Sequence, residues 1–236
     1  MKRSFLVIIA IIALIIITGC SFTKEEEKVE VDKFKEEYES LNGKVIDGTD
    51  LVHRKITIPD DHPFVYKSAN DILTMMDNGE TFVVYFGFAK CPWCRSVLPT
   101  LIDVASDLEL KEIYYVDVSE IRDAYKIEDG EVVISKEGSE GYIGLLKRFE
   151  NVLDDYTLTD EDGEEVEVGE KRIYAPNVIS VVSGQAKQLE TGISEKQEDA
   201  FMDLSKDIKD EMYNKFKCAL KCVMDSKNVC TSKTVC

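Results

Sequence analysis

Two cysteines separated by two residues stand between a stretch typical of a buried strand and a stretch typical of an amphipathic helix. The run 82–86 is β-branched and aromatic without interruption, as a strand buried on both faces requires. Cys91 and Cys94 follow it, and apolar residues then recur at helical spacing over 95–108, before a second buried strand over 113–118. This order predicts a βαβ unit with both thiols at the start of the crossover helix.

The start of a helix is a favourable place for a reactive cysteine. Unpaired backbone N–H groups and the positive end of the helix dipole lower the pKa of a thiol there, and the thiolate is the species that attacks a disulfide. Cys91 occupies this position, and Pro92 costs no hydrogen bond because the first helical N–H has no partner. We therefore expect Cys91 to be ionised and accessible to solvent, and Cys94, one turn further on, to resolve a mixed disulfide.

Two other interpretations of the cysteine pair remain open. A CxxC can be half of a zinc site, but such a site needs a second pair of ligands, and the two histidines of the chain, His53 and His62, lie far upstream. A purely structural disulfide would close a loop too small to stabilise much. His53 is expected to be a surface residue of a strand, and the acidic run 160–170 lacks the ligand order of an EF-hand loop. We expect no metal and no cofactor.

The succession of strand, Cys-Pro-Trp-Cys, helix and strand resembles the active-site half of the thioredoxin superfamily. The Pro-aromatic pair between the cysteines is similar to the glutaredoxin pattern. The resemblance covers residues 64–118 and 172–216, and it implies an α/β fold with a central mixed sheet flanked by helices. It also implies that the chain is an enzyme, a thiol–disulfide oxidoreductase.

The same superfamily carries a cis-proline that faces the CxxC and presents backbone groups to a bound peptide. Pro176, which is preceded by Ala175 and followed by a strand expected over 178–182, matches that position. The resemblance therefore implies that Ala175 and Pro176 contact the client, together with Pro92 and Trp93 between the two cysteines.

Pro176 lies much farther from the CxxC than in plain thioredoxins, so residues 119–172 are expected to form an insertion before the cis-Pro strand. Tyr-Phe-Gly ahead of the CxxC, the insertion and the run 172–176 are together similar to Gram-positive lipoproteins of the thioredoxin family and to bacteriocin-transport accessory proteins. One position departs from the superfamily pattern, because Tyr85 stands where thioredoxin has a buried Asp. Proton transfer at Cys94 would then need another group or water.

The N-terminus has the layout of an export signal. Lys2 and Arg3 precede an unbroken apolar run over 5–17, which is short for a membrane span. The Ile-Thr-Gly-Cys that follows resembles the lipobox of bacterial lipoproteins. This resemblance implies a signal peptide over 1–19, a lipid on Cys20 and a lipid-anchored protein at the outer face of a Gram-positive cell membrane. The alternative is an ordinary signal peptide or an uncleaved anchor helix, and it exports the chain as well.

The rest of the chain divides into a tether, one domain and a tail. Residues 20–43 are expected to form a tether rich in Lys and Glu and then a short amphipathic helix, and the domain is expected over 44–216. Within it the patterns predict strands over 51–58, 64–66 and near 188–189, a helix from Ser68 or Asn70 to Met76, a hairpin tip at 160–163, and a long helix that Ser194 and Gln197 open with a capping box.

The tail over 217–236 carries four more cysteines, which are Cys218, Cys222, Cys230 and Cys236. Outside the cell such an even set usually forms structural disulfides, and three connectivities are possible. Cys218 and Cys222 share one face of the long helix, so a returning tail can be cross-linked to both. We favour pairing Cys218 with Cys236 and Cys222 with Cys230. The alternative is a second redox pair that exchanges with Cys91.

The formal net charge of −17 argues against nucleic-acid binding, because contact with phosphates relies on a surplus of Lys and Arg. Two functions stay open. The first is exchange with protein or peptide thiols and disulfides, with a membrane redox partner that recycles the pair. The second is a non-catalytic accessory module that holds a peptide or a transporter. The intact CxxC favours the enzyme, whereas the direction of exchange depends on a reduction potential that no sequence pattern encodes.

Overall fold

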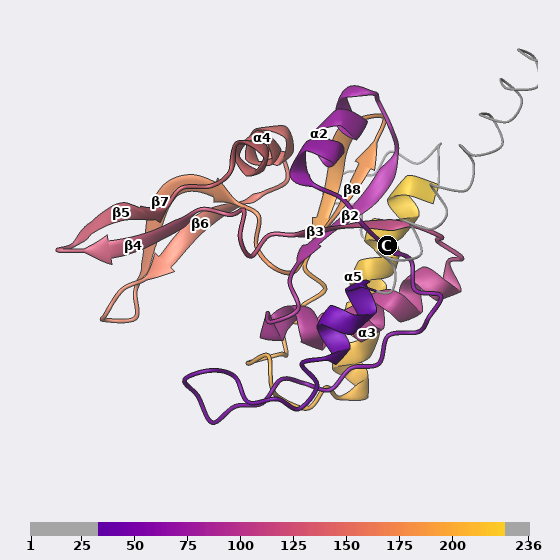
Figure 1. Cartoon of the computed structure of the whole chain (residues 1–236), viewed down its shortest axis with the longest axis horizontal. Helices are drawn as coiled ribbons and strands as arrows, with labels where there is room; N and C mark the ends of the chain where they lie inside the picture. The colour runs from indigo at the N-terminus through magenta and orange to yellow at the C-terminus, as the bar shows by residue number, and fades with distance from the viewer. Residues whose placement is uncertain (1–32, 225–236) are drawn as a thin grey trace, which may run out of the picture.

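The computed structural model describes residues 33–224 and has a mixed α/β architecture built on one central sheet (Figure 1). The strands of this sheet are β1 (Phe64–Tyr66), β2 (Phe82–Gly87), β3 (Ile113–Asp117), β8 (Asn177–Val182) and β9 (Gln185–Glu190). They lie in the order β1-β3-β2-β8-β9. Both β1 and β2 are parallel to β3, whereas β8 is antiparallel to β2 and to β9, so the sheet is mixed.

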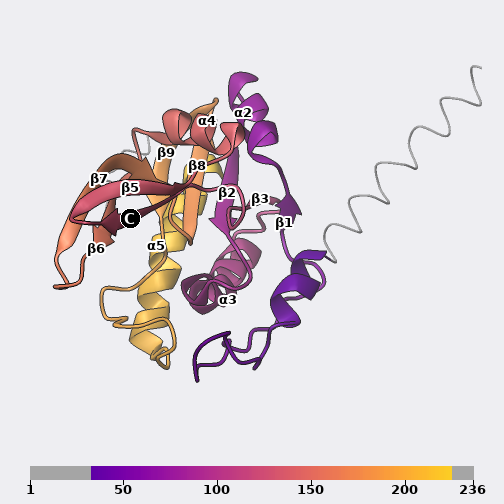
Figure 2. The same cartoon turned by 60° about the vertical axis from the view of Figure 1, so that its left-hand side comes forward.

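Helices cover both faces of the sheet (Figure 2). One face carries a helical segment over 33–39, α3 (Pro92–Asp107) and α5 (Lys206–Met224), and the other carries α2 (Ala69–Asp77) and α4 (Glu140–Phe149). The central strand β2 serves both cores, because successive side chains of a strand point to opposite faces. Val83 and Tyr85 lie in the first core, and Val84 and Phe86 lie in the second.

The unit predicted around the CxxC is confirmed. β2 leads into α3, α3 leads into β3, and the two strands pair in parallel. All six residues of β2 are buried, as the uninterrupted apolar run requires. The predicted helix after Ser68 is also present as α2, and Ser68 caps it by accepting a hydrogen bond from the Asp71 N–H.

Residues 119–172 contain two β-hairpins that project together from one side of the sheet (Figure 1). β4 (Ala124–Glu128) pairs with β5 (Glu131–Lys136), and β6 (Asp154–Thr159) pairs with β7 (Glu165–Arg172). The second hairpin turns at 160–163, as predicted, and the Asp160 carboxylate accepts two backbone N–H groups there. We call these two hairpins the arm.

A buried ion pair joins the two hairpins of the arm at their base. Arg172 at the end of β7 contacts the carboxylate of Asp123, which precedes β4, and both side chains are buried. The same guanidinium lies 4.0 Å from the centroid of the Tyr156 ring on β6. Burial raises the pKa of Asp123, and the Arg172 charge opposes that rise. The base of both hairpins is thus joined through one arginine.

Helix α4 lies between the two hairpins in sequence but does not belong to the arm. Its residues Tyr142, Leu145 and Phe149 are fully buried in the second core, where they cover one face of the sheet. The expected insertion over 119–172 is therefore not one separate unit. Its hairpins project, whereas its helix completes the domain.

The strand predicted over 51–58 does not form. This segment makes one isolated β-bridge and is otherwise without regular structure. Side chains take the place of a partner strand: Asn42 exchanges two hydrogen bonds with the backbone of Ile56, and Glu39 accepts one from the Ile58 N–H. The apolar alternation that suggested a strand reflects the burial of Ile56 and Ile58 in the first core.

Helix α5 begins at Lys206, not at Ser194. The predicted capping box is wrong because both of its side chains have other partners. The Ser194 hydroxyl donates to the Glu211 carboxylate on α5, and the Gln197 amide donates to a serine of α3. These contacts fix an irregular segment against the two helices, so the chain enters α5 later than its apolar pattern suggests.

Both expected ends of the domain move outward. The short amphipathic helix expected within 20–43 is present over 33–39, and its Phe34 and Tyr38 are fully buried in the first core, so this helix packs into the domain. At the other end, the expected boundary between 216 and 217 falls inside α5, where Leu220 is still fully buried.

Several predictions fall outside the described residues. They are the signal peptide over 1–19, the lipid on Cys20, and the choice of Cys236 and Cys230 as the partners of Cys218 and Cys222. Within residues 33–224, no helix combines the length and the apolar character that crossing a membrane demands.

Candidate functional site

The two cysteines of the CxxC lie where β2 passes into α3. Cys91 is the N-cap residue of α3, and Pro92 is its first helical residue. Cys91 Sγ accepts a hydrogen bond from the Cys94 N–H at 3.2 Å, so the sulfur takes the place of the usual capping oxygen. Both cysteines are free thiols.

The two thiols have opposite pKa shifts. A hydrogen bond from the Cys94 side chain lowers the pKa of Cys91, and backbone N–H groups of the first helical turn lower it further against the effect of burial. Burial raises the pKa of Cys94 well above its ordinary value, and the adjacent Cys91 sulfur adds to the rise. The pair thus contains one sulfur that ionises more readily than an ordinary thiol and one that holds its proton more firmly.

Cys91 is less accessible than the sequence led us to expect. Its exposed fraction is 4%, and that of Cys94 is 0%. The partly buried side chains of Phe88, Ala89 and Trp93 pack against the core that holds both sulfurs. The expectation of a solvent-accessible thiol is therefore wrong, because Cys91 is buried in this structure.

A second segment approaches the thiols from β8. The Ala175–Pro176 peptide bond is cis, and Cys91 Sγ donates a hydrogen bond to the Ala175 carbonyl oxygen at 3.2 Å. β8 starts directly after Pro176 and is antiparallel to β2, with Asn177 opposite Phe86. This pairing brings Ala175 and Pro176 to the end of β2, beside the CxxC.

Arg95 is a buried charge that the sequence analysis did not single out. Its side chain is fully buried, and its donors reach the carbonyl oxygens of Tyr38, Arg54 and Ala89 and the side-chain oxygen of Asn42 at 2.6–3.2 Å. Burial lowers the pKa of Arg95, although a guanidinium keeps its charge at any physiological pH. One side chain next to Cys94 therefore holds the segment 33–58 against the CxxC. An arginine directly after the second cysteine, at the head of an apolar helical pattern, was the available signal.

Arg122 is a second residue that sequence reasoning missed. It lies just before the arm, and its guanidinium is 4.8 Å from the centroid of the Phe88 ring, three residues ahead of Cys91. Its positive charge contributes to the lowered pKa of Cys91. No local signal could have found it, because Arg122 is thirty-one positions away from Cys91 in the chain.

A cavity of about 350 Å³ adjoins the CxxC. It lies between the N-terminal helical segment, the loop that leads to Cys91 and the end of β3. Three carboxylates and one ammonium group are among its lining residues, which are Glu37, Ser40, Leu41, Phe88, Ala89, Lys90, Asp117, Ser119 and Glu120. Its volume is within the range of small-ligand pockets, and it is lined by the residues that precede Cys91 but by neither cysteine.

The histidines do not form a metal site with the CxxC. Within residues 33–224, no group of three or more His, Cys, Asp or Glu side chains is arranged to hold a metal ion. His53 is buried and lies outside any strand, so the expectation of a surface strand residue is wrong. Burial and the charge of Arg95 lower the pKa of His53.

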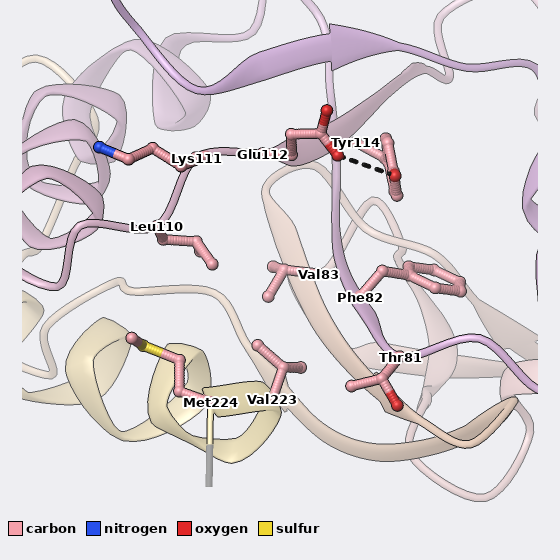
Figure 3. Close-up of a pocket in the computed structure, with 9 residues that line it drawn as sticks. All are labelled: Thr81, Phe82, Val83, Leu110, Lys111, Glu112, Tyr114, Val223 and Met224. Carbon is pink, nitrogen blue, oxygen red and sulfur yellow. Dashed lines mark hydrogen bonds between the residues drawn. The ribbon is translucent and has the colours of Figure 1, made fainter. Parts of the chain in front are cut away.

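Cys218 and Cys222, in the last turns of α5, lie at the other end of the sheet. Cys218 and Cys222 are both disulfide-bonded, whereas Cys230 and Cys236 lie outside the described residues. The residues after Cys222 line a cavity of about 330 Å³ together with Thr81 and Phe82 at the start of β2 (Figure 3). The CxxC follows the opposite end of β2, and a strand of this length spans roughly 20 Å. This placement disfavours direct exchange between Cys222 and Cys91.

Comparison with known proteins does not assign the chain to a family. The chain matches no model of a known protein family, and no curated protein sequence matches it significantly. The resemblance to the thioredoxin superfamily therefore remains a hypothesis.

Proposed function

We propose that this protein is a thioredoxin-like thiol–disulfide oxidoreductase that exchanges disulfides with proteins or peptides outside the cytoplasm. The observation that carries the proposal is the setting of Cys91 Sγ at the start of α3. It lies 3.2 Å from the Cys94 N–H and 3.2 Å from the Ala175 carbonyl oxygen. The opposite pKa shifts of Cys91 and Cys94 support distinct roles in attack and resolution.

The arrangement of the elements supports a thioredoxin-like fold. The CxxC opens the helix that follows the central strand, and the strand after the Ala175–Pro176 bond pairs antiparallel with that central strand. The Ala175 backbone, Pro176, Pro92 and Trp93 would border a client strand laid across Cys91. In this proposal the arm is the part that distinguishes the protein from a plain thioredoxin.

The reaction runs in two steps. The Cys91 thiolate attacks one sulfur of the client disulfide, and the other client sulfur leaves as a thiolate that takes up a proton. Cys94 then loses its proton and attacks Cys91 Sγ, so the Cys91–Cys94 disulfide forms and the second client thiol departs. The client gains two electrons, which a membrane redox partner restores to the CxxC, and the reverse sequence inserts a disulfide into a dithiol client.

The test is the reduction potential of the Cys91/Cys94 couple, measured with Cys218, Cys222, Cys230 and Cys236 replaced by Ser. We expect one two-electron couple, and we expect this variant to catalyse reduction of a peptide disulfide. The additional Cys91→Ser replacement is expected to abolish both. A Cys91/Cys94 pair that exchanges no faster than free cysteine would contradict the proposal.

The second candidate function is a non-catalytic accessory module, and the 4% exposure of Cys91 favours it. The two candidates differ in the fate of a Cys94→Ser variant in the cell envelope. An enzyme would accumulate client proteins bound through a mixed disulfide to Cys91. A module would capture none in this way, yet would still bind its partner when both cysteines are Ala.

We further propose that the protein is anchored at the outer face of the membrane through a lipid on Cys20. Support comes from the apolar run over 5–17 and the Ile-Thr-Gly-Cys that ends it. A Cys20→Ala variant is expected to lose the diacylglycerol that mass spectrometry would detect on the N-terminal peptide. An unmodified Cys20 on a chain that retains residues 1–19 would favour the uncleaved anchor helix instead.

A further inference from the structure

Three buried tyrosines form a cluster behind the CxxC. Tyr38 belongs to the helical segment 33–39, Tyr85 to β2 and Tyr115 to β3, and all three are fully buried. The Tyr85 and Tyr115 rings are stacked with centroids 5.6 Å apart. The hydroxyl oxygens of Tyr38 and Tyr85 are 3.3 Å apart and share a hydrogen bond.

Gly87 allows the Tyr85 hydroxyl to approach the resolving cysteine. A Cβ atom on Gly87 would lie 2.6 Å from the Tyr85 hydroxyl oxygen and 3.2 Å from Cys94 Sγ. The oxygen and the sulfur therefore border the same small space, which any larger residue at position 87 would fill. A hydrogen bond from Tyr85 lowers the pKa of Cys94, against the larger effect of burial.

Tyr85 acts as a donor in this place and not as a base. Burial raises the pKa of Tyr85 well above its ordinary value, and the Cys94 charge raises it further, so the hydroxyl keeps its proton. The groups that act most strongly on Cys94 are Cys91 on the same helix, Tyr85 on β2 and the backbone N–H of Phe88. A neutral hydroxyl here can stabilise a thiolate without adding a second negative charge.

We propose that Tyr85 is a further catalytic residue, which donates a hydrogen bond to Cys94 Sγ while that sulfur attacks Cys91, and that Tyr38 positions the Tyr85 hydroxyl. The proposal rests on the oxidoreductase function proposed above. In this step the Cys94–Cys91 bond forms, the bond between Cys91 and the client sulfur breaks, and the Cys94 proton passes to the departing client thiolate. The carboxylate that thioredoxin has at this position is thus replaced by a hydroxyl group.

The experiment follows both steps with one probe, a small aromatic disulfide that releases a coloured thiol. The full chain, reduced at the CxxC and carrying Cys20→Ser, is mixed with the probe in a stopped-flow instrument. Attack by Cys91 releases the first coloured thiol, and resolution by Cys94 releases the second. We expect Tyr85→Phe to slow the second phase about tenfold at neutral pH and to change the first by no more than about twofold.

Tyr115→Phe is the matched control. It removes a hydroxyl from the same cluster, but Tyr115 acts on Tyr38 and is not among the groups with the largest effect on Cys94. We expect the second phase of Tyr115→Phe to stay within about twofold of the wild-type rate. In Tyr85→Phe, the pH at which the second-phase rate rises should increase by about one unit. Tyr38→Phe, which loosens the Tyr85 hydroxyl, is expected to slow the second phase about threefold.

The outcomes separate the two proposals. A wild-type first phase no faster than that of free cysteine would overturn the oxidoreductase function and this inference with it. Normal wild-type phases combined with equal second phases in Tyr85→Phe and Tyr115→Phe would overturn the role of Tyr85 alone. Circular dichroism of each variant distinguishes a slow second phase from a failure to fold, and Phe fills the same volume as Tyr apart from the hydroxyl.

Discussion

Two helices on the same face of the sheet each carry a pair of cysteines, and the two pairs have different chemistry. Cys91 and Cys94 lie at the N-terminus of α3 and are free thiols, whereas Cys218 and Cys222 lie in the last turns of α5 and are disulfide-bonded. Unpaired N–H groups at a helix N-terminus favour a thiolate, and the negative end of the dipole at a C-terminus disfavours one. In the proposed function, the position along a helix separates a redox-active pair from a structural one.

The segments that pack at the two ends of the sheet are held by different kinds of bond. At the CxxC, the guanidinium of Arg95 joins the segment 33–58 to α3 through hydrogen bonds. At the opposite end, covalent disulfides hold the last turns of α5. The segment at the CxxC is therefore held without a covalent bond, and both thiols of the CxxC are free.

The largest expected effect is the loss of Cys91. Cys91→Ser removes the attacking sulfur, so exchange with a peptide disulfide should fall on the order of a thousandfold. The double replacement of Cys218 and Cys222 by Ser should leave the exchange rate within about threefold, because the α5 pair is remote from the CxxC. The comparison between the two pairs breaks if the α5 variant loses exchange to the same extent.

Stability should show the reverse pattern. Replacing Cys218 and Cys222 by Ser is expected to lower the free energy of unfolding by about 3 kcal/mol, since disulfides restrict the unfolded chain. Reduction of the CxxC alone should change it far less, because the CxxC loop is small. Urea unfolding of the Cys218/Cys222 variant and of the protein reduced at the CxxC measures both free energies of unfolding, and mass spectrometry checks the redox state of each pair. Equal losses of stability in the two cases would contradict this prediction.

A smaller loss of stability is expected at the non-covalent end. Arg95→Met leaves the acceptors on Tyr38, Arg54, Ala89 and Asn42 without their donor in a buried place, so unfolding should become easier by about 2 kcal/mol. Lys90→Met is the control, because Lys90 is exposed nearby and its loss should cost less than about 0.5 kcal/mol. Equal urea midpoints for these two variants would show that the hydrogen bonds of Arg95 do not stabilise the packing of the segment 33–58 on α3.

The smallest expected effect concerns the charge beside Cys91. Arg122→Gln removes a positive charge that lowers the pKa of Cys91, so the thiolate fraction should fall about two- to threefold below that pKa. Above it both proteins carry the thiolate, and their rates should converge. Alkylation of Cys91 by iodoacetamide as a function of pH measures this shift. Lys126→Gln on β4 serves as the control, and a matching loss in that variant would indicate a general charge effect.

Local patterns predicted those parts of the fold that depend on neighbouring residues. The run 82–86 predicted β2, the helical spacing after Cys94 predicted α3, and the order of elements predicted their parallel pairing with β3. The same kind of pattern failed over 51–58 and at Ser194. In both places side chains from other segments supply the hydrogen bonds that a strand partner or a helix cap would have supplied.

The residues of the site also differ in whether the sequence could reveal them. The motif placed Cys91 and Cys94, and the resemblance to the thioredoxin superfamily pointed to the Ala175–Pro176 segment. The sequence could not reveal that Arg95 binds the segment 33–58, or that Tyr38 is a neighbour of Tyr85. Apart from Ala89, their partners lie more than forty positions away, and Tyr38 reaches Tyr85 and Arg95 only when the helical segment 33–39 packs on the sheet.

The sequence by itself determined that a thiol would stand at the start of a crossover helix, since strand and helix periods and the CxxC spacing are properties of adjacent residues. Only the tertiary structure decided how exposed Cys91 is and why the pKa of Cys94 is raised. Both quantities depend on the desolvation and the charges that distant segments bring to one point. That dependence is why the reactivity of the pair is a property of the folded domain and not of its motif.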